Sequence, residues 1–272
     1  LRTVLERDSR ARKVVFLDEL PWLAGAQSSE LIAELSFFWN SWACRQRNII
    51  LVVCGSATSW MLNNVIRDYG GLYSRPTLKI QLHPFSLGEC EQYYCQRHFL
   101  FSRYEIALAY MVLGGIPYYM DMLRNDETLS KNIDRIFFSN HSIKQEFEDV
   151  YVGLFQSSEK YLDIVTTLGN HRYGMTRNEI AQTLGMTSGG GLSTMLDNLE
   201  QSGIVSTYPR RGKNRKETIY RLVDFFSLFY LKNVLHAHPS GTNWMKMQRS
   251  PQCFSWAGIS FEILVAQHLR HL

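Results

Sequence analysis

The stretch Val14-Val15-Phe16-Leu17-Asp18-Glu19 decides the fold of this chain. Four apolar residues in a row are typical of a strand buried on both faces, as the strands of a parallel sheet are. Two carboxylates follow the run directly, so they lie at the carboxyl end of the predicted strand. Open α/β sheets bind their ligands at that edge. The stretch therefore predicts a parallel sheet with a site at Asp18 and Glu19.

The adjacent carboxylates have the form of a Walker-B element. Phosphoryl-transfer sites use one carboxylate to help hold Mg²⁺ and another to orient or deprotonate the attacking water. The glycine-rich loop that usually accompanies this element, GxxxxGK[ST], does not occur in the 272 residues. At this point an alternative stays open, in which Asp18 and Glu19 simply end a strand and are solvated.

A second buried strand is predicted over Ile49–Cys54, after a helix that begins near Glu30. Strand, helix and strand in this order favour a right-handed parallel crossover. Ser56, in the polar turn that follows, would then lie at the same sheet edge as the two carboxylates; the alternative is that it caps the next helix. The alternating pattern of Thr77–Leu82 predicts a third strand, and the exit from the first strand, Leu20–Gly25, is predicted as a turn.

Composition and cysteine usage narrow the class of protein. A hydrophobic content of 45% and an aromatic content of 13% indicate packed globular domains. No apolar run approaches the ~18 residues of a membrane span, and no signal peptide pattern occurs. The five cysteines form no CxxC pair and the eight histidines no HExxH motif, so we expect reduced thiols, a cytoplasmic location and no histidine metal site. Because the sequence begins at Leu1 inside a predicted helix and shows no stop signal at Leu272, we expect a fragment cut at both ends.

The second half of the chain is mostly helical in pattern. Ser86 with Glu89, and Thr176 with Glu179, have the spacing of a capping box. Gly114–Pro117 interrupts a helical region that extends to Leu154. Between Ser158 and Asp224 the order of three helices and a β-hairpin is typical of a winged helix.

The tip of this hairpin is strongly basic. The segment Val205–Arg221 has a net charge of +5, against +4 for the whole chain. Basic side chains near phosphates add a salt-dependent term that does not read sequence, whereas the third helix offers no Lys or Arg for base contacts. We expect either weak DNA contact through the tip or a purely structural role. The candidate contact residues are Arg210, Arg211, Lys213, Arg215 and Lys216.

Taken together, these segments resemble the prokaryotic AAA+/STAND-like P-loop ATPases that carry a C-terminal winged helix followed by a nuclease-like domain. The resemblance rests on VVFLDELPWL, IILVVCGSATSWM, GLYSRPTLKIQLHPFSLGE, GGIPYYM, DFFSLFYLKN and WAGISFE, in this order. It implies an α/β fold: the C-terminal part of a parallel-sheet P-loop NTPase core (1–85), a helical lid (86–154), a winged helix (155–225) and the start of a further domain (226–272).

The resemblance also implies roles for single residues. Asp18 corresponds to the Walker-B aspartate that holds Mg²⁺ through water, and Glu19 to the catalytic glutamate. Ser56 lies where a sensor residue contacts the γ-phosphate or the attacking water, and Arg75 where such ATPases place an arginine that senses nucleotide or acts on a neighbouring subunit. Glu262 has two interpretations, the first acid of a nuclease-like site or part of an ordinary amphipathic helix.

The expected function is ATP binding and hydrolysis with ATP and Mg²⁺ as cofactors, coupled to the winged helix. A homo-oligomer is left open, and no membrane partner is expected. Without a phosphate loop, this fragment alone should not bind ATP usefully, because backbone N–H groups of that loop form most of the phosphate cradle. The rival interpretation is a non-enzymatic DNA-binding regulator that acts through the basic tip.

Overall fold

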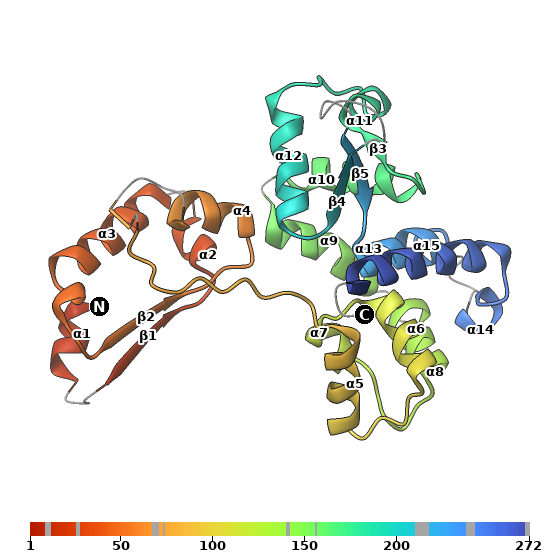
Figure 1. The fold of residues 1–272 in the computed structure, drawn as a ribbon, viewed down its shortest axis with the longest axis horizontal. Helices are drawn as coiled ribbons and strands as arrows, with labels where there is room; N and C mark the ends of the chain where they lie inside the picture. The colour runs from red at the N-terminus through yellow and green to blue at the C-terminus, as the bar shows by residue number, and fades with distance from the viewer. Residues whose placement is uncertain are drawn as a thin grey trace. The chain divides into compact units, whose positions relative to one another are not determined.

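The computed structural model describes residues 1–8, 12–25, 28–66, 71–72, 74–139, 142–155, 157–209, 218–237 and 243–269. The chain forms two compact units, Leu1–Gln81 and Leu82–Leu272, and Figure 1 traces both from the N-terminus to the C-terminus. The fold is mixed α/β and rich in helix. No helix within the described ranges has both the length and the apolar character needed to cross a bilayer.

The first unit is built on two parallel strands. β1 pairs with β2 in the register Lys13↔Ile49 to Leu17↔Val53, which confirms the predicted parallel crossover. Figure 1 shows α2 and α3 on one side of this pair. The described elements are α1 (Arg2–Arg7), β1 (Lys13–Leu17), α2 (Leu20–Ala24), α3 (Ser28–Ser41), η2 (Ala43–Arg45), β2 (Ile49–Val53), α4 (Thr58–Met61) and η3 (Leu62–Ile66).

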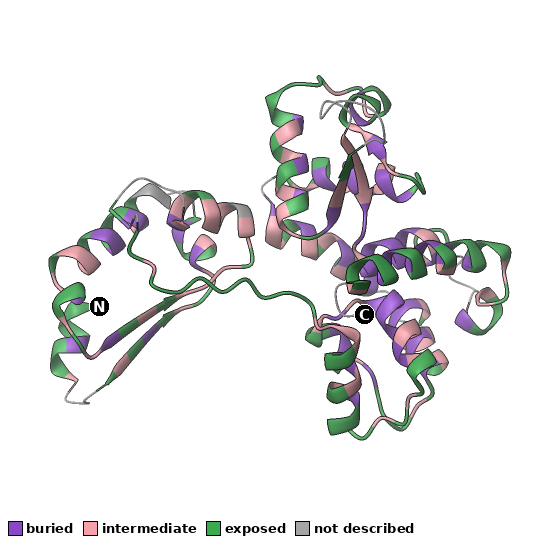
Figure 2. Cartoon of the chain, viewed as in Figure 1, coloured by how far each residue is buried: buried purple, intermediate pink, exposed green. Residues whose placement is uncertain are grey.

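The two faces of this sheet differ in burial, and Figure 2 shows the alternation along both strands. On one face, Val15 and Ile49 are buried against Leu5 of α1. The opposite face is apolar but open: Val14, Phe16, Ile50 and Val52 are 66%, 57%, 56% and 37% exposed. The apolar runs predicted burial on both faces, and among the described residues only one face is covered.

The predicted strand over Thr77–Leu82 is wrong. These residues take no strand assignment, and their apolar side chains Leu78, Ile80 and Leu82 are 74%, 72% and 90% exposed. A period-2 pattern produces a strand only where an edge is available for backbone pairing. Among the described residues the sheet of the first unit consists of β1 and β2, so the pattern has no partner strand there.

The second unit contains one large core, which runs from Cys90 on α5 to Leu264 on α15. The predicted capping boxes at Ser86 and Thr176 are confirmed, and a third at Ser102 was not predicted. The described elements are α5 (Leu87–Gln96), α6 (Arg103–Leu113), α7 (Pro117–Asp121), α8 (Leu129–Ile133), η4 (Asp134–Phe138), α9 (Ser142–Leu154), α10 (Ser158–Gly169), β3 (Met175–Thr176), α11 (Arg177–Thr183), α12 (Gly190–Gln201), β4 (Val205–Pro209), β5 (Thr218–Leu222), α13 (Phe225–Phe229), η5 (Tyr230–Val234), α14 (Trp244–Met247) and α15 (Pro251–His268).

The helices α10, α11 and α12 contact a small antiparallel sheet with the strand order β3-β5-β4. Both hairpin strands were predicted; β3 was not, because two residues are too few for a recognisable pattern. The basic hairpin tip, 210–217, lies outside the described residues. Its predicted nucleic-acid contacts through Arg210, Arg211, Lys213, Arg215 and Lys216 therefore stay a prediction.

The predicted break at Gly114–Pro117 is confirmed, since α6 ends at Leu113 and α7 begins at Pro117. Its tightest point is Gly115. The N–H of Phe85 donates to the carbonyl oxygen of Gly115 at 2.7 Å, and a Cβ on Gly115 would lie 2.0 Å from the carbonyl oxygen of Phe85. Two backbone segments touch here, so only glycine fits.

Candidate functional site

The candidate site lies where β1 and β2 end together. Leu17 is paired with Val53, so the next residues, Asp18 and Cys54, leave the sheet side by side. Backbone hydrogen bonds continue past the strands: the N–H of Cys54 donates to Leu17 at 3.0 Å, and the N–H of Leu20 donates to Cys54 at 2.9 Å. The turns after the two strands are therefore fixed against each other.

Glu19 has its carboxylate bound to the turn after β2. The backbone N–H of Ser56 lies 3.2 Å from each carboxylate oxygen, and the Ser56 hydroxyl donates to Oε2 at 3.0 Å. Glu19 itself has φ 46° and ψ 53°, in the left-handed region, which costs about 1–3 kcal/mol for a residue with a side chain. The side-chain contacts and the helix that follows hold it in this conformation.

The residues after Glu19 form a helix, not the predicted turn. α2 places Leu20 fully in the core and Pro21 in its first turn, where proline lacks only an N–H that has no helical partner. The proline ring packs on Gly55, where a Cβ would lie 2.5 Å from Pro21 Cδ. This close approach keeps the start of α2 against the turn after β2.

Asp18 is bound through one of its two oxygens. Its Oδ1 accepts hydrogen bonds from the N–H of Glu19 at 3.1 Å and from the thiol of Cys54 at 2.7 Å. The hydrogen bond to Asp18 is the largest cause of a raised pKa of Cys54, so the thiol keeps its proton and acts as the donor. The Asp18 side chain is otherwise exposed to solvent.

The structure brings three of the four predicted site residues together, namely Asp18, Glu19 and Ser56. It does not bring Arg75 to them: within the described ranges, no hydrogen bond or ion pair joins the exposed Arg75 side chain to the other three. Cys54 was missed. The signal was present, because the two predicted strands end at Leu17 and near Val53, which makes Asp18 and Cys54 neighbours in a parallel pairing.

The donor set fits a magnesium ion that is held mainly by phosphates and water. Mg²⁺ commonly keeps several waters and binds one or two carboxylates besides its phosphate ligands. Asp18, with one oxygen not bound by a described residue, can serve as such a carboxylate, whereas both oxygens of Glu19 are bound by Ser56. No group of three or more His, Cys, Asp and Glu side chains suited to a metal occurs in the described part of the chain, so a site enclosed entirely by protein ligands is not found there.

Glu262 on α15 lies in the second unit and contacts two arginines. Its carboxylate accepts from Arg172 at 2.7 Å and from Arg221 at 3.2 Å. The two arginines lower the pKa of Glu262, with the hydrogen bond from Arg172 as the largest cause. Glu262 thus ties α15 to the α10–β3 connection and to β5, which favours a structural role over the catalytic interpretation.

This ion pair predicts a pH-dependent contribution of Glu262 to stability. A lowered pKa means that the contribution is present above the ordinary value of 4.5 and is lost as the pH falls through the folded-state value. We expect Glu262→Gln to reduce the free energy of unfolding slightly at pH 7 and low salt, and by less at pH 3. Urea unfolding at both pH values measures this; an equal difference at pH 3 would exclude the ion pair as its cause.

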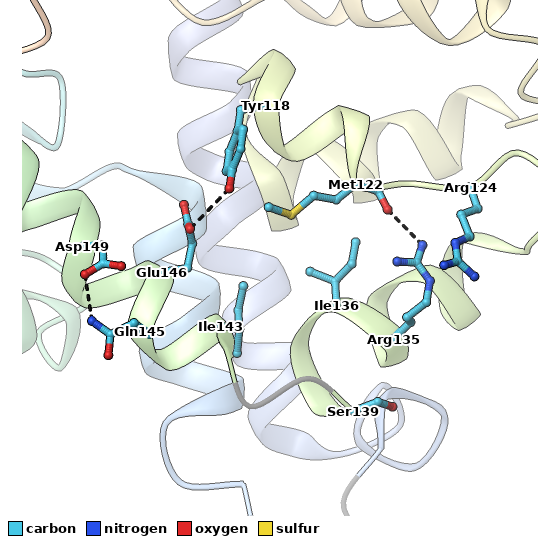
Figure 3. Close-up of a pocket in the computed structure, with 10 residues that line it drawn as sticks. All are labelled: Tyr118, Met122, Arg124, Arg135, Ile136, Ser139, Ile143, Gln145, Glu146 and Asp149. Atoms are coloured by element: carbon cyan, nitrogen blue, oxygen red, sulfur yellow. Dashed lines mark hydrogen bonds between the residues drawn. The ribbon is translucent and has the colours of Figure 1, made fainter. Parts of the chain in front are cut away.

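A pocket of about 640 Å³ also lies in the second unit (Figure 3). Figure 3 shows Tyr118 and Glu146 at one end, joined by a hydrogen bond of 3.5 Å. Arg135 stands at the other end and donates to the carbonyl oxygen of Met122 at 2.9 Å. None of the predicted site residues lines this pocket. Since Arg135 is already bound by the protein itself, the pocket does not indicate a ligand.

Comparison with known proteins gives one informative match. No protein-family model matches the chain, and no curated protein does. Among solved structures, the chain is similar to the Walker-type ATPase PABY2304 of Pyrococcus abyssi, with a TM-score of 0.57 and 20% sequence identity. The match covers 81% of this chain and 63% of that one, so the chain spans less than two thirds of the similar protein. Over most of its length, the chain therefore shares the fold of part of that structure.

Proposed function

We propose that the protein binds ATP with Mg²⁺ and hydrolyses it at the carboxyl edge of the β1–β2 sheet. One observation carries the proposal: Glu19, in a strained backbone conformation, has its carboxylate held by the N–H and the hydroxyl of Ser56. These hydrogen bonds join an acid that can act on water to the polar turn that follows β2. The similarity of the fold to a Walker-type ATPase supports the same conclusion.

Asp18 and Glu19 have different tasks in this proposal. Asp18 would hold Mg²⁺ through a water, and the ion would supply neutralisation of the charge on the phosphates. Glu19 accepts a hydrogen bond or a proton from the attacking water, which general-base catalysis requires at hydrogen-bond distance. Ser56 orients Glu19 through its backbone N–H and its hydroxyl. Arg75 stays a candidate for sensing nucleotide or a neighbouring subunit.

We assign the phosphate cradle to residues outside this sequence, because the 272 residues contain no GxxxxGK[ST] loop. The open face of the sheet supports this assignment. Parallel sheets are normally covered on both faces, whereas Val14, Phe16 and Ile50 are each more than half exposed. The free face is apolar surface that a further element of the ATPase core would bury.

We further propose that 155–225 is a winged helix that relays the nucleotide state to other parts of the protein. The element order α10, β3, α11, α12, β4, β5 and the strand order β3-β5-β4 support the identification. On α12, Asp197 and Glu200 are exposed, and the helix contains no Lys or Arg. A helix of this charge is poorly suited to a DNA groove, so the proposal gives the domain a relay function.

Asp18→Asn tests the proposed site through its metal dependence. In the protein as its gene encodes it, we expect the Mg²⁺ concentration for half-maximal phosphate release from ATP to rise by about 10- to 100-fold, the usual cost of removing an outer-shell metal partner. Glu6→Gln is the matched control, since Glu6 is an exposed carboxylate of the same unit that pairs with Arg2. An unchanged Mg²⁺ dependence in Asp18→Asn would overturn the assignment.

A further inference from the structure

We propose that Cys54 is a positioning residue for Asp18: its thiol fixes which carboxylate oxygen faces the metal-bound water. The inference rests on the proposed function, because it concerns the carboxylate assigned to Mg²⁺. It starts from one contact, the hydrogen bond of 2.7 Å from Cys54 Sγ to Asp18 Oδ1. This hydrogen bond joins residues that are 36 positions apart in the chain, so it is a tertiary contact at the sheet edge and not part of a local turn.

The position of the thiol is set by the backbone around it. The N–H of Cys54 donates to Leu17, and its carbonyl oxygen accepts from Leu20. The next residue, Gly55, is in close contact with the ring of Pro21. Cys54 is therefore held on both sides by the chain segment that carries Asp18, and its side chain is presented to that carboxylate by the sheet register.

Two donors occupy the same carboxylate oxygen. Asp18 Oδ1 accepts from the N–H of Glu19 and from the thiol of Cys54, whereas no residue in the described ranges donates a hydrogen bond to Oδ2. A carboxylate can turn about its last bond, and a broad torsion of this kind is easily disordered. With Oδ1 held by two donors, Oδ2 is the oxygen left for a water of the Mg²⁺ shell.

The same turn holds the second carboxylate, because Ser56 donates to Glu19. The segment Cys54–Ser56 thus orients both acids, one through a thiol and the other through a hydroxyl and an N–H. Because the thiol of Cys54 contacts Asp18, we place its effect on the reaction through that carboxylate. Loss of the thiol should consequently weaken metal use and leave the chemical step intact.

The hydrogen bond itself can be tested without nucleotide. The S–H stretching vibration lies in a region of the infrared spectrum that other protein groups leave clear. The difference between wild type and Cys54→Ser isolates this thiol from Cys44, Cys90, Cys95 and Cys253. We expect a band at lower frequency than that of the exposed Cys95, isolated in the same way, and a shift back to higher frequency in Asp18→Ala. A band that does not respond to Asp18→Ala would overturn the inference, whether or not the protein hydrolyses ATP.

The functional effect is tested by metal titration. Cys54→Ala should raise the Mg²⁺ concentration for half-maximal ATP hydrolysis by about tenfold, since hydrogen bonds to charged groups are worth more than neutral ones, while kcat at saturating Mg²⁺ stays within about twofold. Cys54→Ser retains a donor and should restore most of the metal affinity.

A Mn²⁺ titration followed by electron paramagnetic resonance gives the same comparison without turnover, so it remains decisive if ATP hydrolysis is not found. Equal metal affinity of wild type and Cys54→Ala would overturn the inference. So would a Cys54→Ser variant that unfolds at the wild-type temperature but binds the metal as weakly as Cys54→Ala.

Discussion

Glu19→Gln is expected to slow ATP hydrolysis by about 10²- to 10⁴-fold, the usual contribution of a positioned general base. Glutamine has nearly the shape of glutamate and keeps one oxygen that can accept from Ser56, so the turn should stay in place. Its amide cannot take a proton from water. ATP should still bind, with a dissociation constant within about threefold of wild type, because Glu19 has no assigned role in holding the phosphates.

The measurement is single-turnover hydrolysis of radiolabelled ATP beside nucleotide binding, both on the protein as its gene encodes it. Glu6→Gln serves again as the control, since it removes one carboxylate from an exposed pair on α1 in the same unit. A turnover rate equal to wild type would take the catalytic role away from Glu19. A loss of ATP binding in parallel with turnover would instead assign it a part in holding the nucleotide.

Gly115→Ala is expected to destabilise the second unit by about 3 kcal/mol or more, which combines overpacking with the loss of a backbone hydrogen bond. The added methyl would lie 2.0 Å from the carbonyl oxygen and 2.7 Å from the nitrogen of Phe85. Backbone atoms cannot rotate away as the end of a side chain can, so the two segments must separate. The hydrogen bond from Phe85 to Gly115, now 2.7 Å, would break with them.

Thermal unfolding followed by circular dichroism should show a midpoint about 10 °C lower for Gly115→Ala, given the usual entropy of unfolding for a unit of this size. Gly88→Ala, in the first turn of α5, is the matched control. A Cβ there meets nothing within 4 Å, and replacing glycine in a helix typically stabilises by about 0.5–1 kcal/mol. Similar midpoints for the two variants would mean that the segments at Gly115 can move apart at little cost.

The elements that local chemistry specifies could be predicted from the sequence. The capping boxes at Ser86 and Thr176 depend on two side chains three residues apart, and both are present. The parallel pairing of β1 and β2 followed from two apolar runs and a helix between them. The prediction of a strand over Thr77–Leu82 was wrong because a strand does not depend on its own sequence alone. The alternating pattern was correct for a strand, but a strand also needs a neighbouring strand edge to pair with.

The candidate site was predicted in part. Asp18, Glu19 and Ser56 could be placed at one edge because parallel strands end on the same side of a sheet. The left-handed conformation of Glu19 could not, because it arises from the start of α2 and from the contacts with Ser56. Cys54 escaped notice because a cysteine at the end of a buried strand also fits an ordinary small core residue.

The register of β1 and β2 has a consequence for how this protein can change in evolution. Removing a single residue from either strand would turn its side chains to the opposite face, and it would separate Asp18 from Cys54 and Glu19 from Ser56 at once. Insertions in the turn at 46–48, between η2 and β2, are tolerated far better, since doubling the length of a flexible loop costs only about 0.6 kcal/mol. Homologues should accordingly differ in length at the turn before β2 and keep the five-residue strands.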